Sequence, residues 1–381
     1  MRIEDDWIRR PGTRAVCDAL VAGGYRALFV GGCVRNALLG VPVGDIDIAT
    51  DAPPEAVMAC AQEAELRPVP TGIEHGTITV VSGGVPHEVT TFRADIETDG
   101  RHAQVAFGQS IEADARRRDF TMNALYATPD GHVIDPLGGL PDLRARRVRF
   151  IGDPAQRIRE DTLRILRFFR FHACYGDPEG GLDAEGLAAC ATAQDSLATL
   201  SRERIGAEMR KLLGAPDPAP SVAAMQAAGV LGAILPGADG AALAPLVHIE
   251  SETGTPPDSL RRLAALGGED VPERLRLSRA ESRRLARLRD GIADPVSPAE
   301  LGYRLGVRDG GDIVLLRAAL LGTPPAPDAF DDLRRGAAAV CPVRATDLMP
   351  GHSGADLGRR LSEIEARWIA SGFTLGREDL L

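Results

Sequence analysis

The sequence lacks the long apolar run and the paired cysteines that would direct it to a membrane or an oxidising compartment. No stretch approaches the roughly 20 apolar residues that cross a bilayer. The first residues, MRIEDDWIRR, are charged and unlike a secretory signal. The six cysteines are scattered, with no C-x-x-C pair and no clustered histidines, which argues against a zinc site or a disulfide framework. We therefore expect a cytoplasmic protein with reduced thiols and no membrane partner.

Lysine is almost absent, since Lys211 is the only one, and arginine supplies nearly all of the positive charge. The formal net charge of −10 argues against a general nucleic-acid coat protein. Nine arginines nevertheless lie between Arg144 and Arg170, against three carboxylates. An acidic protein can bind a polyanion through one such basic band, although a solvated helix face would show the same pattern.

The predicted elements divide the chain into a mixed first third and a helical remainder. With 381 residues, 44% of them hydrophobic, the chain is long enough for about two to four cooperative units. In the first third, turn residues separate segments of helical and strand pattern. Helices are predicted at 13–22, 33–40 and 55–65, strands at 26–32 and 45–50, a hairpin at 76–93, and a helix followed by a hairpin at 119–136.

Beyond residue 141 the strand pattern almost disappears. Segments 160–176, 201–214 and 221–235 have helical spacing and glycine stops. We therefore predict an α+β N-terminal head, a mixed sheet with flanking helices, at 1–142. An elongated all-α remainder follows it, as a neck at 143–215 and a body and tail at 216–381.

Two aspartates one residue apart mark the first candidate site. The segment VGDIDIAT, residues 43–50, puts Asp45 and Asp47 on the same face of a strand. Two carboxylates there repel unless they are solvated or share a cation. Such a pair can hold Mg²⁺ ions for phosphoryl chemistry, whereas exposed strand ends are the ordinary alternative.

A glycine pair and an arginine precede these aspartates. In FVGGCVRNALLG, residues 29–40, a strand leads into Gly31 and Gly32 and then into a short helix that carries Arg35. Glycines at such a turn let a phosphate approach the backbone N–H groups at the helix start. The spacing is not G-x-G-x-x-G, so a dinucleotide fold is not predicted. G-G-x-x-R followed about ten residues later by D-x-D is a stronger signal of a phosphate site than either part alone.

Two later segments concentrate arginine beside carboxylates. ARRRDFTMNALY, residues 115–126, contains Arg117, Arg118 and Asp119, and guanidinium groups suit bidentate contact with triphosphate oxygens. REDTLRILRFFRF, residues 159–171, has helical spacing and carries Glu160, Asp161, Arg164, Arg167 and Arg170. A solvent-facing cluster and an intrahelical Glu160–Arg164 ion pair are the plain structural alternatives.

These motifs, in this order, resemble those of the class II tRNA nucleotidyltransferase (CCA-adding enzyme) and bacterial poly(A) polymerase family, within the polymerase-β-like nucleotidyltransferases. The resemblance covers most of the chain and is specific from Leu28 to Leu213. It implies catalysis and Mg²⁺ binding by Asp45 and Asp47. It implies nucleotide binding by Gly32, Arg35, Arg117, Arg118, Glu160, Asp161, Arg164, Arg167 and Arg170. One departure is Asn36, where the family commonly has aspartate.

The resemblance also implies how the base is read. Asp161 and Arg164 match an E-D-x-x-R template in which a carboxylate accepts from the exocyclic amine of cytosine or adenine and an arginine donates to ring acceptors. Uracil and guanine present a carbonyl instead, and each such mismatch costs roughly 1–3 kcal/mol. The segment 94–108, with Arg101 and His102, resembles a mobile loop of the family that helps the change from C to A addition.

Two further expectations complete the prediction. Glu88, in PHEVTTFR, is a candidate third carboxylate, although a surface strand glutamate is the alternative. The expected activity is template-independent addition of CCA to the 3′ end of tRNA from CTP and ATP, with release of pyrophosphate. A poly(A) polymerase, or an enzyme that adds only CC or only A, shares the same motifs. A non-catalytic RNA-binding protein would not be expected to keep both aspartates.

Overall fold

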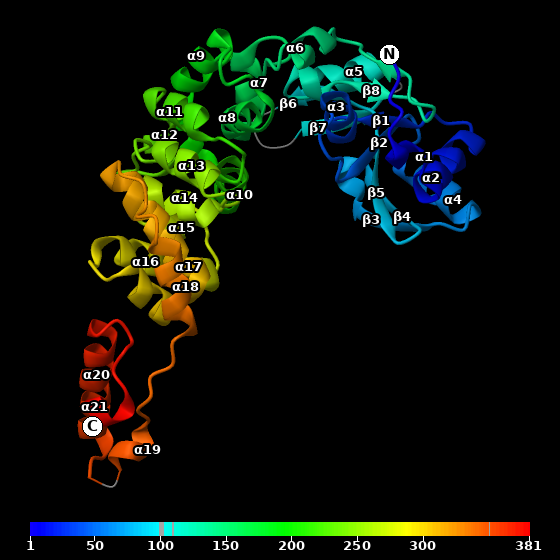
Figure 1. Cartoon of the computed structure of the whole chain (residues 1–381). Helices are drawn as coiled ribbons and strands as arrows, with labels where there is room; N and C mark the ends of the chain where they lie inside the picture. The colour runs from blue at the N-terminus through cyan, green and yellow to red at the C-terminus, as the bar shows by residue number, and fades with distance from the viewer. Residues whose placement is uncertain (99–102, 109, 350) are drawn as a thin grey trace. The chain divides into compact units, whose positions relative to one another are not determined.

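A seven-stranded mixed sheet forms the centre of the N-terminal part of the chain (Figure 1). The computed structural model describes residues 1–98, 103–108, 110–349 and 351–381. The strand order is β3-β4-β5-β2-β1-β8-β9, in which β2 and β5 run parallel and the other neighbours antiparallel. The strands are β1 (Leu28–Val30), β2 (Ile46–Thr50), β3 (Arg67–Gly72), β4 (Thr77–Ser82), β5 (Val85–Thr91), β8 (Tyr126–Ala127) and β9 (Val133–Ile134).

Helices flank this sheet, as predicted. α2 (Pro11–Ala22) and α4 (Pro54–Glu63) pack on each other and on β4, while α3 (Gly32–Leu39) packs on β1 and β2. Prolines lie in the first turns of α2 and α4, and Gly40, in the left-handed conformation at φ 68°, ends α3. The predicted α+β head with a mixed sheet is confirmed.

The predicted helix at the start of 119–136 is wrong. The structure has only a 3₁₀ turn, η2 (Thr121–Asn123), before β8. Phe120 is extended and forms an isolated bridge with Phe150. The Asp119 carboxylate accepts from the Phe120 N–H at 2.9 Å and from Asn123 Nδ2 at 2.9 Å. These bonds hold the turn at Asp119, and the extended backbone at Phe120 prevents a helix from starting there.

The segment 94–108 was predicted as a loop, but most of its described residues belong to a separate two-stranded antiparallel sheet. β6 (Arg93–Thr98) pairs with β7 (Ala103–Phe107). Its two singled-out residues, Arg101 and His102, lie outside the described residues.

The remaining elements are helical, as predicted for the part of the chain beyond residue 141. In the described ranges no strand follows β9, although Ala238 and Gly267 form an isolated bridge. The helices besides those above, with three 3₁₀ turns, are α1 (Asp6–Arg9), η1 (Ile73–His75), α5 (Ile111–Arg116), η2 as given, α6 (Leu140–Arg144), α7 (Pro154–Glu160), α8 (Leu163–Tyr175), α9 (Ala184–Thr192), η3 (Gln194–Thr199), α10 (Arg202–Leu213), α11 (Ala219–Ala227), α12 (Val230–Ile234), α13 (Leu243–Glu252), α14 (Ser259–Leu266), α15 (Val271–Arg274), α16 (Arg279–Ala293), α17 (Pro298–Leu321), α18 (Ala329–Ala338), α19 (Ala345–Leu348), α20 (Gly354–Ala370) and α21 (Arg377–Leu380).

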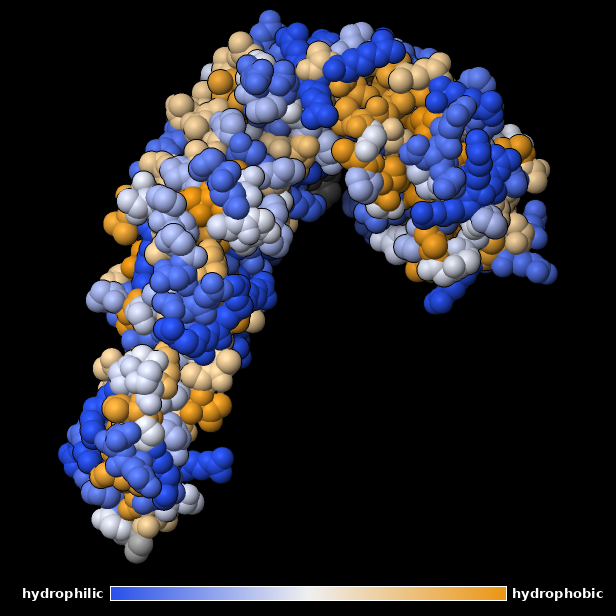
Figure 2. Space-filling view, viewed as in Figure 1, coloured by the Kyte–Doolittle hydropathy of each residue, from blue (hydrophilic) through white to orange (hydrophobic). Residues whose placement is uncertain are grey.

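The chain forms two compact units. Unit 1 contains Met1–Arg204 and Ala227–Ile234, and unit 2 contains Ile205–Gln226 and Leu235–Leu381. The predicted three-part division, with boundaries at 142 and 215, stays a prediction. On the face shown in Figure 2, hydrophilic residues cover much of the surface of each unit, with smaller hydrophobic areas among them. None of the described helices is long and apolar enough to span a membrane.

Inside unit 1, a cluster of phenylalanines attaches α8 to the sheet region. The Phe120 ring lies 4.9 Å from that of Phe150 and 5.1 Å from that of Phe171, and Phe150 stacks on Phe168 at 5.3 Å. All four side chains are buried. Burial of aromatic rings in such stacked and tilted pairs holds α8 beside Phe120, which directly precedes η2, and beside Phe150.

Segment 160–176, predicted as one helix, is broken at its second residue. α7 ends at Glu160, Asp161 is extended with φ −152° and ψ 104°, and α8 begins at Leu163. The Asp161 carboxylate accepts from the Leu163 N–H at 3.1 Å. Aspartate is common at helix starts because its carboxylate accepts from a backbone N–H that has no partner within the helix.

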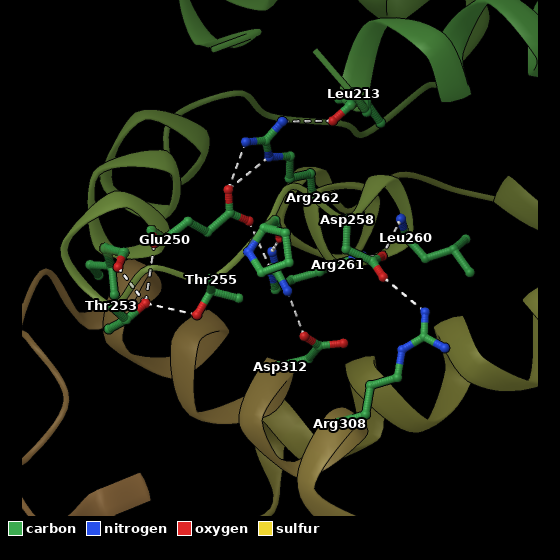
Figure 3. Close-up of polar contacts among 12 residues, drawn as sticks. Leu213, Glu250, Thr253, Thr255, Asp258, Leu260, Arg261, Arg262, Arg308 and Asp312 are labelled. Carbon is green, nitrogen blue, oxygen red and sulfur yellow. Dashed lines mark hydrogen bonds and ion pairs between the residues drawn. The ribbon is translucent and has the colours of Figure 1, made fainter. Parts of the chain in front are cut away.

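A buried ion network holds the helices of unit 2 together (Figure 3). Glu250, on α13, accepts from Arg261 at 2.7 Å and from Arg262 at 2.7 Å, both on α14. Arg261 also donates to Asp312 of α17 at 2.6 Å, and Arg262 to the Leu213 carbonyl at 2.8 Å. The four charged side chains are at most 6% exposed, so each charge depends on the others for compensation.

The C-terminal helices form a small core of their own within unit 2. Val343, Ile364, Trp368 and Leu380 are buried together. Tyr303 of α17 packs edge-on against Trp368 at 5.5 Å and donates to Glu365 at 2.7 Å. These contacts attach α20 and α21 to α17.

Candidate functional site

A polar pocket of about 620 Å³ lies in unit 1 and gathers most of the predicted site residues. Its wall is built from the start of α3, the start of β2, the segment after α5, the α7–α8 junction and the first turn of α10. The lining residues are Gly31, Gly32, Arg35, Asp45, Asp47, Arg117, Arg118, Asp119, Asn123, Asp161, Leu163, Arg164, Arg167, Arg170, Phe171 and Arg204. The pocket therefore joins segments that lie up to about 170 residues apart in the sequence.

The aspartate pair lies at one side of this pocket. Asp45 immediately precedes β2 and is exposed, and Asp47 is half-buried within the strand. Burial, and next the negative charge of Glu88, raise the pKa of Asp47 to about 6, although Arg118 acts in the opposite direction. A cation at Asp47 would favour its ionised form, and carboxylate oxygens are the ligands that Mg²⁺ prefers. The residues present therefore fit a divalent cation.

Glu88 lies on the strand next to this pair. It is opposite Asp47 in the parallel β2–β5 register, but its side chain is exposed and does not line the pocket. Among the residues that the structure describes, no group of three His, Cys, Asp or Glu side chains is placed to hold a metal ion. The role of Glu88 as a third carboxylate stays a prediction.

The glycine pair forms the wall where α3 begins. Gly31 has φ 69°, a backbone conformation that other residues rarely adopt. A Cβ at this position would lie 3.5 Å from Arg118 Nη1. The helix dipole adds partial positive charge at this wall, which favours an anion.

One buried carboxylate holds both pocket arginines that follow α5. Asp114 accepts from Arg117 Nε at 2.9 Å, from Arg118 Nη2 at 2.9 Å and from the Tyr126 hydroxyl at 2.6 Å. Burial alone would raise the pKa of Asp114, but the charges of Arg118 and Arg117 outweigh it and lower that pKa to about 2. The two guanidinium groups are thereby fixed side by side at the pocket, with one carboxylate between them.

A second carboxylate holds the middle of α8. Asp119 accepts from Arg167 Nε at 2.7 Å as well as from Asn123. Burial alone would raise the pKa of Asp119. The positive charge of Arg167 outweighs that effect, so the pKa of Asp119 is lowered. Both Asp119 and Asn123 line the pocket and connect its arginines to the backbone of η2.

The α7–α8 junction separates the two predicted template carboxylates. Asp161 lines the pocket, and both its oxygens accept from Arg204 Nη2, at 3.0 and 2.9 Å. Glu160 does not line the pocket. It accepts from Arg157 and, at 2.6 Å, from Arg164 Nη1, so the Glu160–Arg164 ion pair considered as the structural alternative is present, although it joins α7 to α8 and does not lie within one helix. Arg164 also donates to the Arg117 carbonyl at 2.8 Å, which joins α8 to the segment after α5.

The pocket thus brings together the predicted Gly32, Arg35, Asp45, Asp47, Arg117, Arg118, Asp161, Arg164, Arg167 and Arg170, and leaves Glu160 and Glu88 outside it. Sequence analysis missed Leu163, Phe171 and Arg204 as lining residues. The first two lie within the predicted template segment. Arg204 lies on α10, which begins more than 40 residues after Asp161, and no local sequence pattern indicated that it lines the pocket.

Comparison with family models matches two parts of the chain. Residues 27–149 match the poly A polymerase head domain, and residues 182–241 match a probable RNA- and SrmB-binding site of polymerase A. Sequence relatives include the human mitochondrial CCA tRNA nucleotidyltransferase 1, 41% identical over 203 residues, which are 53% of this chain and 47% of that protein. The CCA-adding enzyme of Geobacillus stearothermophilus is 43% identical over 219 residues, 57% and 52% of the two chains. The chain spans about half the length of the curated relatives it matches.

Solved structures match over nearly the whole chain. The crystal structure of the Bacillus stearothermophilus CCA-adding enzyme in complex with CTP superposes with a TM-score of 0.76 at 31% identity, covering 95% of this chain and 94% of that one. The Thermotoga maritima CCA-adding enzyme complexed with tRNA gives a TM-score of 0.68 at 19% identity, with 96% and 92% covered. At that identity the second likeness concerns the fold alone.

Proposed function

Because the chain belongs to the nucleotidyltransferase family of CCA-adding enzymes and poly(A) polymerases, we propose that it adds CCA to the 3′ end of tRNA from CTP and ATP. The observation that carries the proposal is the single pocket in which an aspartate pair, a cluster of arginines and the Asp161 carboxylate meet. The relative solved with CTP, at 31% identity over nearly the full length, supports the choice of nucleotide.

Asp45 and Asp47 are proposed to hold Mg²⁺, the divalent ion that suits their donor set. When bound, the metal would lower the pKa of the attacking 3′-hydroxyl and stabilise the departing pyrophosphate. Asp45 is exposed and can reach an incoming ligand, whereas Asp47 is anchored within β2. Both carboxylates therefore lie at the start of a central strand of the sheet.

The triphosphate is proposed to lie between the start of α3 and the segment after α5. Arg117 and Arg118 have part of their charge compensated by Asp114, but two guanidinium groups share that single carboxylate. Arg35 and the backbone at Gly32 lie on the facing wall. Arginines held by hydrogen bonds in this way bind phosphate oxygens without first losing much side-chain freedom.

Asp161 and Arg164 are proposed to read the base. An ionised Asp161 can only accept hydrogen bonds, so it would pair with the amine of cytosine or adenine and leave the carbonyl of uracil or guanine unmatched. Arg204 holds both oxygens of this carboxylate, and the Leu163 N–H holds one. Arg164, Arg167 and Arg170 face the same pocket from α8. We include Glu160 only as a residue that orients Arg164, at 2.6 Å.

The helical part beyond the pocket is proposed to bind the tRNA through its backbone and shape, because an A-form helix offers little sequence to read. The match of residues 182–241 to a probable RNA-binding site supports this proposal. None of the six cysteines, all of which lie in the described part of the chain, forms a disulfide, which suits the reducing cytoplasm proposed as its location.

One assay separates CCA addition from the poly(A) and partial alternatives. The purified protein is incubated with tRNA transcripts that end before CCA, after C and after CC, with CTP, ATP, both together, UTP or GTP, and the products are sequenced. With CTP and ATP together, we expect each transcript to be completed to CCA and not to be extended further. Long A tails, or addition that stops at CC with both nucleotides present, would overturn the proposal.

A further inference from the structure

Arg35 is a buried cation held by neutral groups alone. It lies on α3, and only 6% of its surface is exposed. Its Nη1 donates to Asn123 Oδ1 at 2.6 Å, its Nε and Nη2 donate to Asn36 Oδ1 at 3.2 and 2.8 Å, and its Nη2 donates to the Tyr175 hydroxyl at 2.8 Å. The guanidinium also lies 3.9 Å from the centre of the Tyr175 ring and 5.1 Å from that of Phe171. Each of these contacts orients the charge without cancelling it.

Among the described residues, no carboxylate forms an ion pair with Arg35. Asp119 and Asp47 attract it at longer range, but the Asp119 oxygens accept from Arg167 and Asn123, and neither carboxylate forms an ion pair with Arg35. The nearby Arg170 acts in the opposite sense. Burial of an uncompensated charge is costly, and proteins rarely keep one that no partner or ligand offsets. Since Arg35 lines the pocket, the missing counter-charge is the one that a ligand would bring.

The composition of the chain makes this arrangement unusual. The sequence contains only two asparagines, Asn36 and Asn123, and both accept from Arg35. Each amide also donates in another direction, Asn36 to the Pro42 carbonyl at 2.8 Å and Asn123 to Asp119 at 2.9 Å. An amide can accept from a guanidinium and donate elsewhere at once, whereas a carboxylate can only accept and would neutralise the arginine.

We propose that Asn36, Asn123 and Tyr175 form a neutral cage that leaves the charge of Arg35 uncancelled, and that this charge draws the phosphates of the incoming nucleotide into the pocket. The identity of the ligand as a nucleoside triphosphate rests on the function proposed above. The four hydrogen bonds of the cage leave one guanidinium N–H, on Nη1, for a phosphate oxygen. Asn36 and Asn123 are positioning residues in this scheme, since they act through Arg35.

Asn36 offers the cleanest test, because exchanging its amide for a carboxylate changes the charge with almost no change of shape. Asn36→Asp would place a negative charge on Arg35 and lose the bond to Pro42. Asn36→Ala loses the bond to Pro42 and also both bonds from Arg35, but it adds no charge, so a larger loss in Asn36→Asp than in Asn36→Ala measures the electrostatic part. Gln62→Glu makes the equivalent amide-to-carboxylate exchange at an exposed position on α4 and serves as the matched control.

The probe is inorganic tripolyphosphate, which has no base, titrated calorimetrically into the full-length protein with and without Mg²⁺. We expect Asn36→Asp to weaken binding about tenfold, the size of one charge-assisted hydrogen bond. Asn36→Ala should weaken it less, and Gln62→Glu should bind as the unchanged protein does. In the extension assay, Asn36→Asp should raise KM for CTP and for ATP by the same factor and leave the choice of base unaltered.

Equal affinity of the unchanged protein and Asn36→Asp would overturn the cage, as would an Asn36→Ala variant at least as weak as Asn36→Asp. A defect limited to one nucleotide would overturn it too. Thermal unfolding of each variant establishes that the measured protein is folded. If the expected tripolyphosphate pattern holds but no preparation extends tRNA, the cage is supported and the proposed function fails instead.

Discussion

Exchanging Asp161 for asparagine should change which base the protein accepts before it abolishes nucleotide transfer. Asp161 Oδ1 accepts from the Leu163 N–H and from Arg204, while Oδ2 accepts only from Arg204 among the residues that the structure describes. The asparagine oxygen must therefore take the Oδ1 position, where an acceptor is needed. Its amide NH₂ then occupies the Oδ2 position and becomes a donor, and Arg204 keeps only one of its two contacts.

A donor at this position matches the carbonyl of uracil and opposes the amine of cytosine. Each hydrogen bond made or lost is worth roughly 1–3 kcal/mol, so the preference for CTP over UTP should fall by about 5- to 150-fold. The assay is single-turnover extension of tRNA lacking its CCA, with kcat/KM determined separately for CTP and UTP. Asp195→Asn, an exposed position on η3, is the control with the same chemical change. If the ratio of the two kcat/KM values is the same in Asp161→Asn and in the control, Asp161 does not read the base.

Three other predictions follow from the same structure. Replacing Asp45 and Asp47 together by asparagine should abolish extension while the thermal unfolding midpoint stays near that of the unchanged protein; retained incorporation would refute the metal assignment. Glu250→Gln breaks the buried network of unit 2 and should lower the free energy of unfolding by about 3 kcal/mol, measured by urea denaturation; a loss below about 1 kcal/mol would mean that the network is not coupled as described. Burial lowers the pKa of His87 below its ordinary value of about 6.5. The unfolded chain therefore takes up this proton first, so stability should be complete above about pH 6.5 and fall as the pH drops below it, and His87→Gln should remove part of that loss in pH-dependent urea titrations.

Local pattern was sufficient for most of the head. The helix that ends at Gly40 and the hairpin that turns at Gly83 and Gly84 depend on turn chemistry within a few residues, and both were predicted. The helix expected after Asp119 failed for a tertiary reason. Phe120 is drawn into the cluster with Phe150 and Phe171, and its backbone is extended where the helix would have begun.

The sequence by itself indicated most of the charged groups of the pocket, because D-x-D in a strand and G-G-x-x-R before it restrict what those residues can do together, although Arg204 was not predicted and Glu160 lies outside the pocket. Only the tertiary structure decided how these groups are paired. Arg204 reaches Asp161 across 43 positions, and Tyr175 reaches Arg35 across 140. Contacts between residues so far apart in the sequence arise from helix packing, so no local sequence pattern indicates them. The same packing decided that Glu160 turns away from the pocket toward Arg157 and Arg164, whereas Asp161, one residue later, faces into it.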